Sequence, residues 1–393
     1  MKPNIILLGS VYPEELRLEL LSSKSDLSNA AHVFQSSLIS GLQEISSVTL
    51  ISSPKIWLKR NERCSIGGYT FKIGESPNNH IYIGFKKYFN KLHELRCVNK
   101  ELRLLLHNTP SSHVLIYSLY SPFLLASLFC PKHKTTVVVP DLPEYMSGNT
   151  SLVYKSLKKL DRLIINLCLK HVDSFVLFSQ HMKDKLPIQE RPQLLIEGIY
   201  KDYSSGNTHI EKETNNTLLY TGGICQRYGV FDLINAFTQI KDANYTLWLC
   251  GDCDDLELLN SYLKTDYRIK YFGCIDMQEV RILQRRATLL INPRRSTEEF
   301  AKYSFPSKTL EYMASGTPTL MCKLPATPED YIQHLYFFED ESIEGYKSKI
   351  LEICSKNKKE LYEKGMQASC FVRKNKNEIS QAKRLVNFLI NNK

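Results

Sequence analysis

The stretch ATLLINPRRSTEEFAKYSFPSKTLEYMASGTPTL, from Ala287 to Leu320, decides how the chain can fold. Thr288 to Asn292 is a short apolar run closed by Asn-Pro, which is typical of a buried strand that ends where proline removes a ladder donor. Ser304 is the expected helix cap, Pro306 fits the first turn of the helix that follows, and Gly316 ends it. The N-terminus of this helix would face the carboxyl ends of the strands, where open α/β sheets bind anions.

The string SFPSKTLEYMASGTP within this stretch resembles the donor-sugar loop and helix of retaining GT-B glycosyltransferases, in particular those of glycosyltransferase family four that build bacterial surface polysaccharides. Less specific motifs extend the resemblance from Thr217 to Met321, and weakly into the N-terminal half. The resemblance implies a GT-B fold, in which two doubly wound Rossmann-like α/β domains face each other across a cleft. It also implies that Glu311 binds the ribose hydroxyls of a nucleotide sugar and that the backbone amides before it hold the diphosphate.

Length and composition fit two globular domains of ordinary size. The chain has 393 residues, 43% of them hydrophobic, and no apolar run approaches the roughly 18 to 20 residues of a membrane span. The start, MKPNIILLGSVYPEE, has no small-residue cleavage site, so it indicates a first strand and not a secretion signal. The eleven cysteines are scattered singly, which indicates neither a zinc cage nor a disulfide framework. We therefore expect a cytoplasmic protein.

The formal net charge of +10 comes largely from two clusters, Lys86 to Arg103 and Lys155 to Lys170. We do not expect nucleic acid as the partner, because no helix-turn-helix, finger or RNA-binding signature accompanies the charge. An anionic membrane surface or a diphosphate-bearing substrate fits as well. The charge therefore leaves open a peripheral position on the inner face of the cell membrane.

Both basic clusters have the periodicity of amphipathic helices. In the first cluster the apolar side chains that share a face are Phe89, Leu92, Leu95, Val98 and Leu102. Two interpretations stay open for it: packing on the sheet with a solvated basic face, or peripheral membrane contact. The second cluster predicts a helix over 157–169, whose inward side chains are expected to be Leu160, Ile164, Leu167 and Cys168.

The chain divides into two halves that each open with a strand, a turn containing glycine, and a helix. Residues 1–205 form the expected N-terminal acceptor-binding domain, which opens with the apolar run Asn4 to Leu8. The polar segment KDYSSGNTHIEKETNN, starting at Lys201, marks the linker. Residues 206–375 form the expected nucleotide-sugar-binding domain. The resemblance implies that the tail, 376–393, is a helix that crosses back to the N-terminal domain.

Candidate ligand-binding residues gather at strand ends and in the stretch quoted first. Two adjacent glycines follow the strand Leu218 to Tyr220 and precede a helix, so the backbone there can approach a ligand closely. Glu311 gains about 0.3–1 kcal/mol from the helix dipole when it is ionised, and its alternative role is to stabilise that first turn. The residues expected to contact the nucleotide sugar are Gly222, Gly223, Arg227, Gly273, Ser304, Phe305, Pro306, Ser307, Lys308 and Glu311.

Catalysis requires donors where the leaving diphosphate gains charge, and Lys308 and Arg294 are the charged candidates. Their alternative role is solvated surface charge. Asp141 and Glu144 lie in a proline-stiffened loop after the strand Thr136 to Val139, where they either meet the acceptor sugar or cap their own loop. Asp141 is the third catalytic candidate.

Three positions depart from the family pattern. The arginine and lysine of the family's first glycine loop are replaced by Gly223 and Tyr228, and the first of its paired glutamates by Tyr303. Glu298 and Glu299 lie nearby and could substitute for that glutamate. Charge neutralisation of the diphosphate would then depend on other cations.

The leading hypothesis is a retaining, metal-independent hexosyltransferase that moves a sugar from a UDP-sugar to a lipid-linked or cell-surface glycan. The resemblance implies a front-face mechanism, although the family's first-domain histidine is missing and Ser118 and Tyr120 occupy its neighbourhood. No Asp-x-Asp motif sits at a strand end, so we expect neither a metal nor a cofactor beside the nucleotide sugar. The alternatives are a noncatalytic GT-B subunit that binds glycan or a partner transferase, and a GT-B nucleotide-sugar epimerase or phosphorylase.

Overall fold

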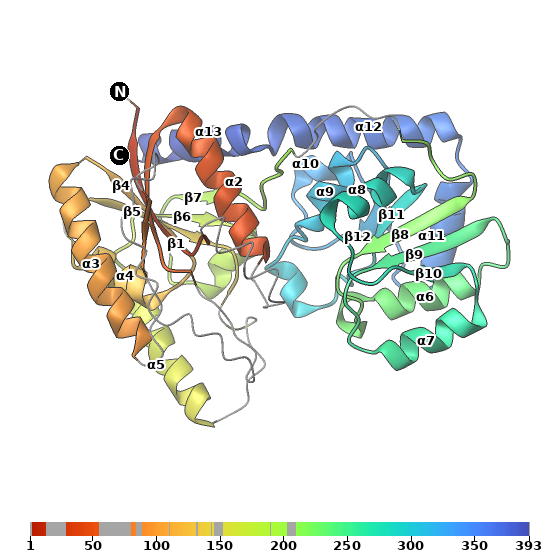
Figure 1. Ribbon diagram of the computed structural model, residues 1–393, viewed down its shortest axis with the longest axis horizontal. Helices are drawn as coiled ribbons and strands as arrows, with labels where there is room; N and C mark the ends of the chain where they lie inside the picture. Colours follow the sequence, from red (N-terminus) through yellow and green to blue (C-terminus); the bar gives the residue numbers. More distant parts are fainter. Residues whose placement is uncertain are drawn as a thin grey trace. The chain divides into compact units, whose positions relative to one another are not determined.

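The computed structural model describes residues 2–12, 29–54, 80–83, 89–109, 111–130, 133–142, 144, 152–188, 190–202 and 210–392 (Figure 1). The chain forms two compact units, one of Met1–Ile199 with Glu378–Lys393 and one of Tyr200–Asn377. Tyr200 belongs to the second unit because its N–H donates to the carbonyl of Lys376 at 2.8 Å. The division therefore lies a few residues from the boundaries at 205 and 375 that the sequence suggested.

The first unit is built on a seven-stranded parallel sheet with the strand order β3-β2-β1-β4-β5-β6-β7. Alternate residues of the first strand, Ile5 and Leu7 on one face and Ile6 and Leu8 on the other, are at most 2% exposed. Continuous apolar strands of this kind form because helices cover both faces of a parallel sheet. The strands are β1 (Asn4–Gly9), β2 (Ser47–Ser52), β3 (His80–Tyr82), β4 (His113–Tyr117), β5 (Lys134–Val139), β6 (Ser174–Leu177) and β7 (Gln193–Leu195).

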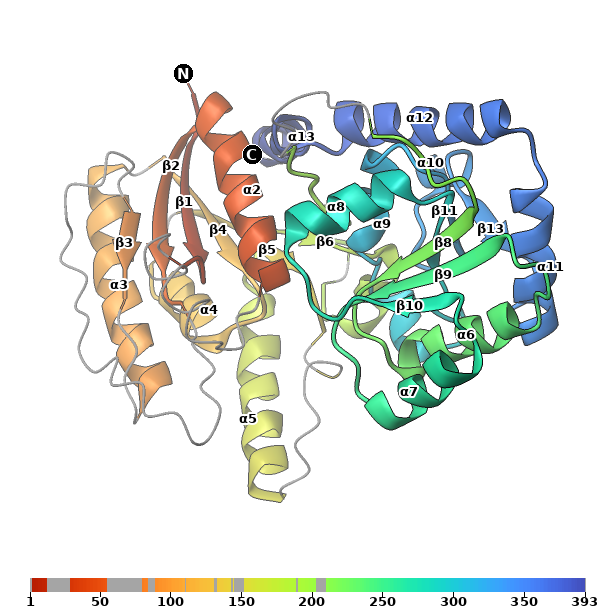
Figure 2. The ribbon, with the colours of Figure 1, turned by 45° about the vertical axis from the view of Figure 1, so that its right-hand side comes forward.

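Helices form two rows on this sheet. The first row, α2 (Asn29–Ile45) and α13 (Glu378–Asn391), packs on the face that carries Ile5 and Leu7. The second row is α3 (Asn90–Asn108), α4 (Ser121–Leu128) and α5 (Leu152–Leu169), with α4 packed between the other two. Figure 2 shows the N-terminal turns of α5 extending past the strands of its own unit. None of the described helices combines the length and hydropathy that crossing a bilayer requires.

The inward face of α5 differs from the prediction. Leu160 and Leu167, expected to point inward, are 56% and 60% exposed, whereas Ile165 and Leu169 are 4% and 0% exposed. The prediction for these two leucines was wrong because α5 carries apolar residues nearly all the way round, so its periodicity fits more than one face. Cys168 is buried, as predicted.

The apolar face predicted for α3 is only partly buried. Val98 and Leu102 are fully buried, but Phe89 is 86% exposed and Leu92 is 47% exposed. The Glu94 side chain points inward in their place, and its carboxylate accepts hydrogen bonds from the hydroxyls of Ser53 and Tyr120. Polar pairing inside the unit has therefore turned the helix away from its apolar stripe.

The second unit is a six-stranded parallel sheet with the order β10-β9-β8-β11-β12-β13 (Figure 1). Its strands are β8 (Asn216–Thr221), β9 (Tyr245–Cys250), β10 (Ile269–Tyr271), β11 (Leu289–Asn292), β12 (Thr319–Cys322) and β13 (Tyr336–Phe338). Its helices are α6 (Val230–Thr238), α7 (Leu256–Thr265), α8 (Met277–Arg286), α9 (Lys308–Ala314), α10 (Glu329–Ile332), α11 (Ile343–Cys354) and α12 (Lys358–Asn375). The predicted strand, loop, helix, strand order of residues 287–320 is confirmed as β11, α9 and β12.

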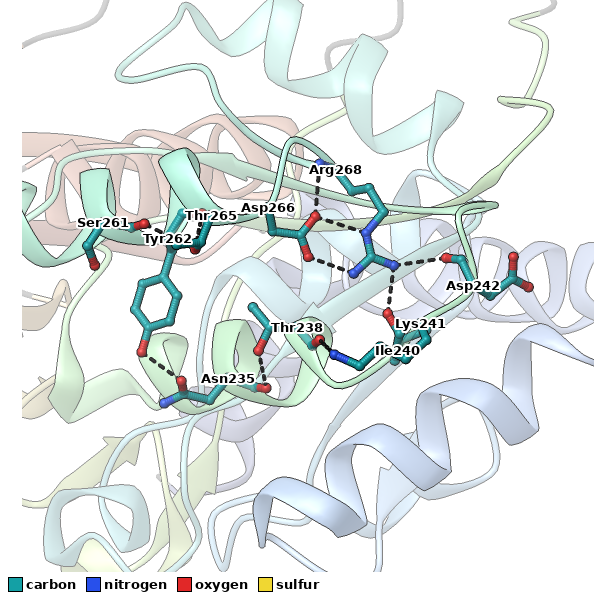
Figure 3. A network of polar contacts seen from close by, with 10 residues as sticks. All are labelled: Asn235, Thr238, Ile240, Lys241, Asp242, Ser261, Tyr262, Thr265, Asp266 and Arg268. Atoms are coloured by element: carbon teal, nitrogen blue, oxygen red, sulfur yellow. Dashed lines mark hydrogen bonds and ion pairs between the residues drawn. The ribbon is translucent and has the colours of Figure 1, made fainter.

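An ionic network fixes the turns at the amino edge of this sheet (Figure 3). The Arg268 guanidinium pairs with Asp266 at 2.6 Å and donates to the carbonyls of Ile240 and Asp242 at 2.6 and 2.9 Å. It also lies 4.8 Å from the centre of the Phe237 ring. The pair, with side chains only 10% and 11% exposed, braces the α7–β10 turn, and the two bonds from Arg268 to backbone carbonyls tie that turn to the α6–β9 turn.

Candidate functional site

Three glycines form the carboxyl edge of the second sheet, one after each of β8, β9 and β10. Gly222, Gly251 and Gly273 have φ values of +135°, +130° and +65°, in a region that side-chain-bearing residues rarely adopt. The Gly251 N–H donates to the Gly273 carbonyl at 2.8 Å, and a Cβ on Gly251 would lie 2.1 Å from the Gly222 oxygen. The edge therefore presents backbone without side chains, which a ligand can approach closely. We call Gly222, Gly251 and Gly273 together the glycine floor.

The Lys308 side chain reaches across this floor from the first residue of α9. A Cβ on Gly222 would lie 1.3 Å from the Lys308 Nζ, so the ammonium occupies the space that the missing side chain leaves. The ammonium is 5.5 Å from the centre of the Tyr220 ring, whose hydroxyl donates to the Gly223 carbonyl at 2.8 Å. The absence of a side chain at Gly222 thus places a positive charge beside the glycine turn.

The start of α9 differs from the prediction. Ser304 does not cap the helix, because the helix begins at Lys308 and Ser307 precedes it with helical backbone angles and no side-chain cap. The first turn is closed by the Thr309 N–H, which donates to the Pro306 carbonyl at 2.9 Å. Phe305 is buried and anchors the loop, with its ring 4.9 Å from that of Tyr331. The amides of Ser307 and Lys308 stand ahead of the first bonded donor.

Two arginines share one aromatic ring beside the same floor. The Arg227 and Arg294 guanidinium carbons lie 4.1 and 5.0 Å from the centre of the Phe300 ring, and Arg294 is 5.1 Å from the centre of the Tyr228 ring. Among the described residues, the buried Arg294 Nη1 has no hydrogen-bond partner. Tyr228, which replaces the family's lysine, therefore supports a cation instead of supplying one.

Burial and crowding shift the charges of this cluster. Burial lowers the pKa of Lys308 to about 8, with Glu311 opposing the shift and Arg294 adding to it. Burial likewise raises the pKa of Glu311, against the pull of Lys308 and Arg281. The pKa of the Arg294 guanidinium is lowered, first by burial and then by Arg227. An anionic ligand would relieve this crowding of positive charge.

The sequence offered Glu298 and Glu299 as substitutes for the first of the family's paired glutamates. Tyr303 stands at that position and is 8% exposed. Glu298 precedes a short 3-10 turn, and Glu299, the first residue of that turn, is exposed. The turn instead presents the Phe300 ring to the two arginines.

The candidate residues of the first half lie at the carboxyl edge of the other sheet. Asp141 is exposed after β5 and helps burial to raise the pKa of Tyr117. Glu144 forms an ion pair with Arg162 of α5, which supports the loop-fastening role for that carboxylate. Ser118, after β4, has a φ of +74°, a strained conformation for serine.

The second unit thus brings together most of the residues singled out in the sequence, and it adds others that were missed. Gly251 completes the floor, Tyr220 and Phe300 hold the cations, and Arg281 acts on Glu311. Gly251 was detectable, because it directly follows an apolar strand, as Gly222 follows the strand that ends at Thr221. The contacts of the Tyr220 and Phe300 rings with the cations could not be predicted, because they depend on loop conformations that have no periodic sequence pattern.

Residues 215–356, most of the second unit, match the family model of glycosyl transferases group 1. No curated protein matches the chain. The structure as a whole is similar to sucrose-phosphate synthase from Thermosynechococcus elongatus, with a TM-score of 0.64 and 13% identity over 99% of this chain and 100% of that one.

Two further solved structures have the same architecture. The HepE protein of Anabaena, in complex with UDP, has a TM-score of 0.62 and 12% identity, and all of both chains is covered. The lipopolysaccharide outer core galactosyltransferase WaaB has a TM-score of 0.60 and 15% identity, with 99% of each chain covered. These likenesses establish the GT-B fold, with two Rossmann-like parallel-sheet domains. The family match itself is confined to residues 215–356 of the second unit.

Proposed function

We propose that the protein transfers a sugar from a UDP-sugar to a glycan acceptor. The observation that carries this proposal is the convergence of Lys308 and Arg294 on a bare glycine floor, with Glu311 one turn further along α9. The structure of HepE holds UDP, which supports UDP as the nucleotide of the donor.

The diphosphate, in this proposal, lies over Gly222 and Gly223. Lys308 and Arg294 neutralise its charge, and the unpaired Nη1 of Arg294 is a ready donor for a phosphate oxygen. Arg227 adds a third cation from the same aromatic stack. These cations take over the work of the two basic residues that the glycine loop lacks.

Recognition of the nucleoside falls to Glu311. When ionised, its carboxylate accepts hydrogen bonds from both ribose hydroxyls, and each bond to a charged group contributes about 1.5–3 kcal/mol. The Gly273 turn, which has open space where a side chain would begin, leaves room beside the floor for the rest of the nucleoside. The remaining proposed contacts, from Ser304 to Ser307, are made by the loop that enters α9.

We propose transfer with retention of anomeric configuration, by a front-face mechanism. The bond from the anomeric carbon to the diphosphate oxygen breaks while the acceptor oxygen bonds to that carbon from the same side. The acceptor proton passes to the leaving phosphate oxygen, which gives a glycoside and UDP. Lys308 and Arg294 stabilise the charge that develops on the diphosphate, so we expect turnover to persist in the presence of a chelator.

We propose that Asp141, at the carboxyl edge of the first sheet, orients the acceptor hydroxyl. The acceptor itself would be a lipid-linked or cell-surface glycan, and the enzyme would work in the cytoplasm, peripherally on the inner face of the cell membrane. The basic residues of α3 and α5 support this location. Residues 86–88 of the first basic cluster lie outside the described residues.

The experiment that tests the activity measures UDP release from a panel of UDP-sugars, with and without membrane extract. Release that depends on both sugar and extract supports transfer, and the anomeric configuration of the product tests retention. Tight UDP binding without turnover would instead favour the noncatalytic subunit, a role consistent with the buried Tyr303 at the glutamate position. Conversion of the donor without any acceptor would indicate an epimerase or phosphorylase.

A further inference from the structure

The α5 helix exposes a row of leucines that the fold does not use. Leu157, Leu160, Leu163 and Leu167 are 61%, 56%, 61% and 60% exposed. At about 100° per residue, these four lie within an arc of about 120° and span about 15 Å of the helix. Apolar side chains so regularly placed on an outer face indicate a surface that another body covers. We call these four residues the leucine face.

The opposite side of α5 is buried against the rest of the first unit. Ile165, Cys168 and Leu169 are at most 4% exposed and pack into the first unit. The outward direction of the leucine face is therefore fixed by the fold and does not result from a loosely attached helix. Figure 2 shows the N-terminal turns of α5, which lead into this face, extending past the strands of the unit.

The charges around the leucine face have one sign. Lys159 and Lys170 are exposed along one border of its arc. The one acidic residue of α5, Asp161, is held by Lys91 of α3 at 2.7 Å and by the Ser121 hydroxyl at 2.6 Å. The helix therefore presents leucines flanked by cations, with its negative charge already neutralised.

We infer that the leucine face docks on an anionic lipid bilayer, with the leucines in the acyl boundary and the lysines at the phosphate groups. Leucines beside lysines on one helix match the two layers of an anionic membrane surface. A stable protein interface requires about 20 to 30 residues a side, which is far broader than this single row. The inference rests on the membrane location in the proposed function and assigns it to one helix face.

The test uses the full chain and vesicles of phosphatidylethanolamine with phosphatidylglycerol, compared with vesicles of phosphatidylcholine. Co-sedimentation should occur with the first kind and be at least about tenfold weaker with the second. The double variant Leu160→Ser/Leu163→Ser should lose at least about tenfold in partitioning, since it removes half of the apolar face. Lys159→Glu/Lys170→Glu should lose binding to the anionic vesicles in a similar way.

A matched control is Leu256→Ser/Leu258→Ser on α7, where the leucines are 51% and 38% exposed. This control should bind vesicles like the parent chain. Circular dichroism and UDP affinity check that every variant is folded. Unchanged sedimentation of the Leu160→Ser/Leu163→Ser variant overturns the inference. Failure of the parent chain to bind either kind of vesicle also overturns it. If the parent chain is then found to be a dimer that the Leu160→Ser/Leu163→Ser variant dissociates, a second copy of the chain covers the leucine face.

The same experiment separates this inference from the nucleotide site. Glu311→Ala should still bind vesicles, and the α5 variants should still bind UDP. Loss of vesicle binding in the α5 variants with UDP affinity intact supports the surface whatever the donor site does. Failure of UDP to bind any variant, the parent included, would count against the proposed function alone.

Discussion

Lys308 holds its ammonium in a crowded, partly buried position, and its charge is therefore sensitive to pH near neutrality. Its pKa of about 8 means that a small rise in pH removes the proton in the free protein. In the proposed site, a bound diphosphate would raise that pKa again, because it would add negative charge beside the ammonium. Binding and protonation are thus linked at this one side chain.

We predict that affinity for a UDP-sugar falls by up to about tenfold per pH unit above about pH 8, where Lys308 loses its proton in the free protein. The sign follows from the order of the pKa values: above the free value and below the bound value, the protein must take up a proton to bind. Isothermal titration calorimetry across this range measures the slope. The variant Lys308→Met should bind more weakly and show a flatter profile, and an equal slope in both proteins would contradict the assignment.

Changing Glu311 to Ala should weaken UDP affinity while leaving the fold intact. The expected loss is about 1.5–3 kcal/mol for each of the two hydrogen bonds from the ribose hydroxyls to the carboxylate that disappear. Burial raises the Glu311 pKa, so the parent protein should also lose affinity as the pH falls through that raised value. Calorimetry gives the affinity and thermal unfolding gives the stability. Unchanged affinity would show that the ribose binds elsewhere.

The glycine floor predicts unequal costs for the same substitution. Gly251→Ala should destabilise by about 1–3 kcal/mol, because its Cβ would meet the Gly222 oxygen at 2.1 Å and its φ is +130°. Gly273→Ala is the control, since nothing lies within 4 Å of its Cβ and its φ of +65° is more easily tolerated. Urea unfolding of both variants measures the difference. Equal costs would mean that the close approach of Gly251 and Gly222 is unimportant.

At the scale of elements, the helices show where sequence patterns determine a structure and where they do not. The parallel strands were predictable, because a strand covered on both faces must be apolar throughout, as Ile5 to Leu8 are. The inward face of α5 was not, since leucines surround the helix and only the packed unit selects Ile165 and Leu169. The burial of Glu94 in α3 was not predictable either, because its hydrogen-bond donors, Ser53 and Tyr120, lie far from it in the sequence.

The Arg268–Asp266 pair should stabilise the second unit in a pH-dependent way. Hydrogen bonding from Arg268 lowers the pKa of Asp266 in the folded protein. This contribution is therefore present above the unfolded value of about 3.9 and is lost as the pH falls through the lower folded value. Acid unfolding followed by circular dichroism should show a shallower loss of stability in Asp266→Asn. At neutral pH, Arg268→Ala should cost on the order of 3 kcal/mol, because it removes the cation from a largely buried carboxylate that keeps only weaker backbone bonding.

The whole molecule depends on a tail that returns to the unit where the chain began. Ala382 and Leu385 of α13 are 0% exposed and share a core with Phe34 and Leu38 of α2. A Cβ on Gly41 would lie 2.2 Å from the Glu378 carbonyl, so the two helices approach closely. The core of the first unit therefore combines side chains of α2 with those of α13, more than 300 positions later in the chain.

Leu385→Ala should destabilise the protein by about 2–5 kcal/mol, the usual cost of truncating a fully buried leucine. Ile390→Ala on the same helix, at a position 40% exposed, is the matched control and should cost much less. Chemical denaturation of both variants measures the difference. A similar cost at both positions would show that α13 is not a core element.

The candidate site was predictable to the extent that it consists of strand ends and one helix start. Gly222 was identified because it follows a strand and precedes a helix, whereas Lys308 and Glu311 were identified through the resemblance of the string SFPSKTLEYMASGTP. The contacts of Arg227 and Arg294 with the Phe300 ring were not predictable, because the three residues come from loops, whose conformations have no periodic sequence pattern.

The pairing of Tyr200 with Asn377 makes the second unit an insertion in the first. The Tyr200 N–H donates to the Lys376 carbonyl at 2.8 Å, so the chain enters and leaves residues 200–377 at adjacent points. A segment whose two ends meet in this way can be cut out and grafted as one cassette. Exchange of residues 200–377 for the corresponding part of another GT-B protein would replace the whole second unit and require only two splice points.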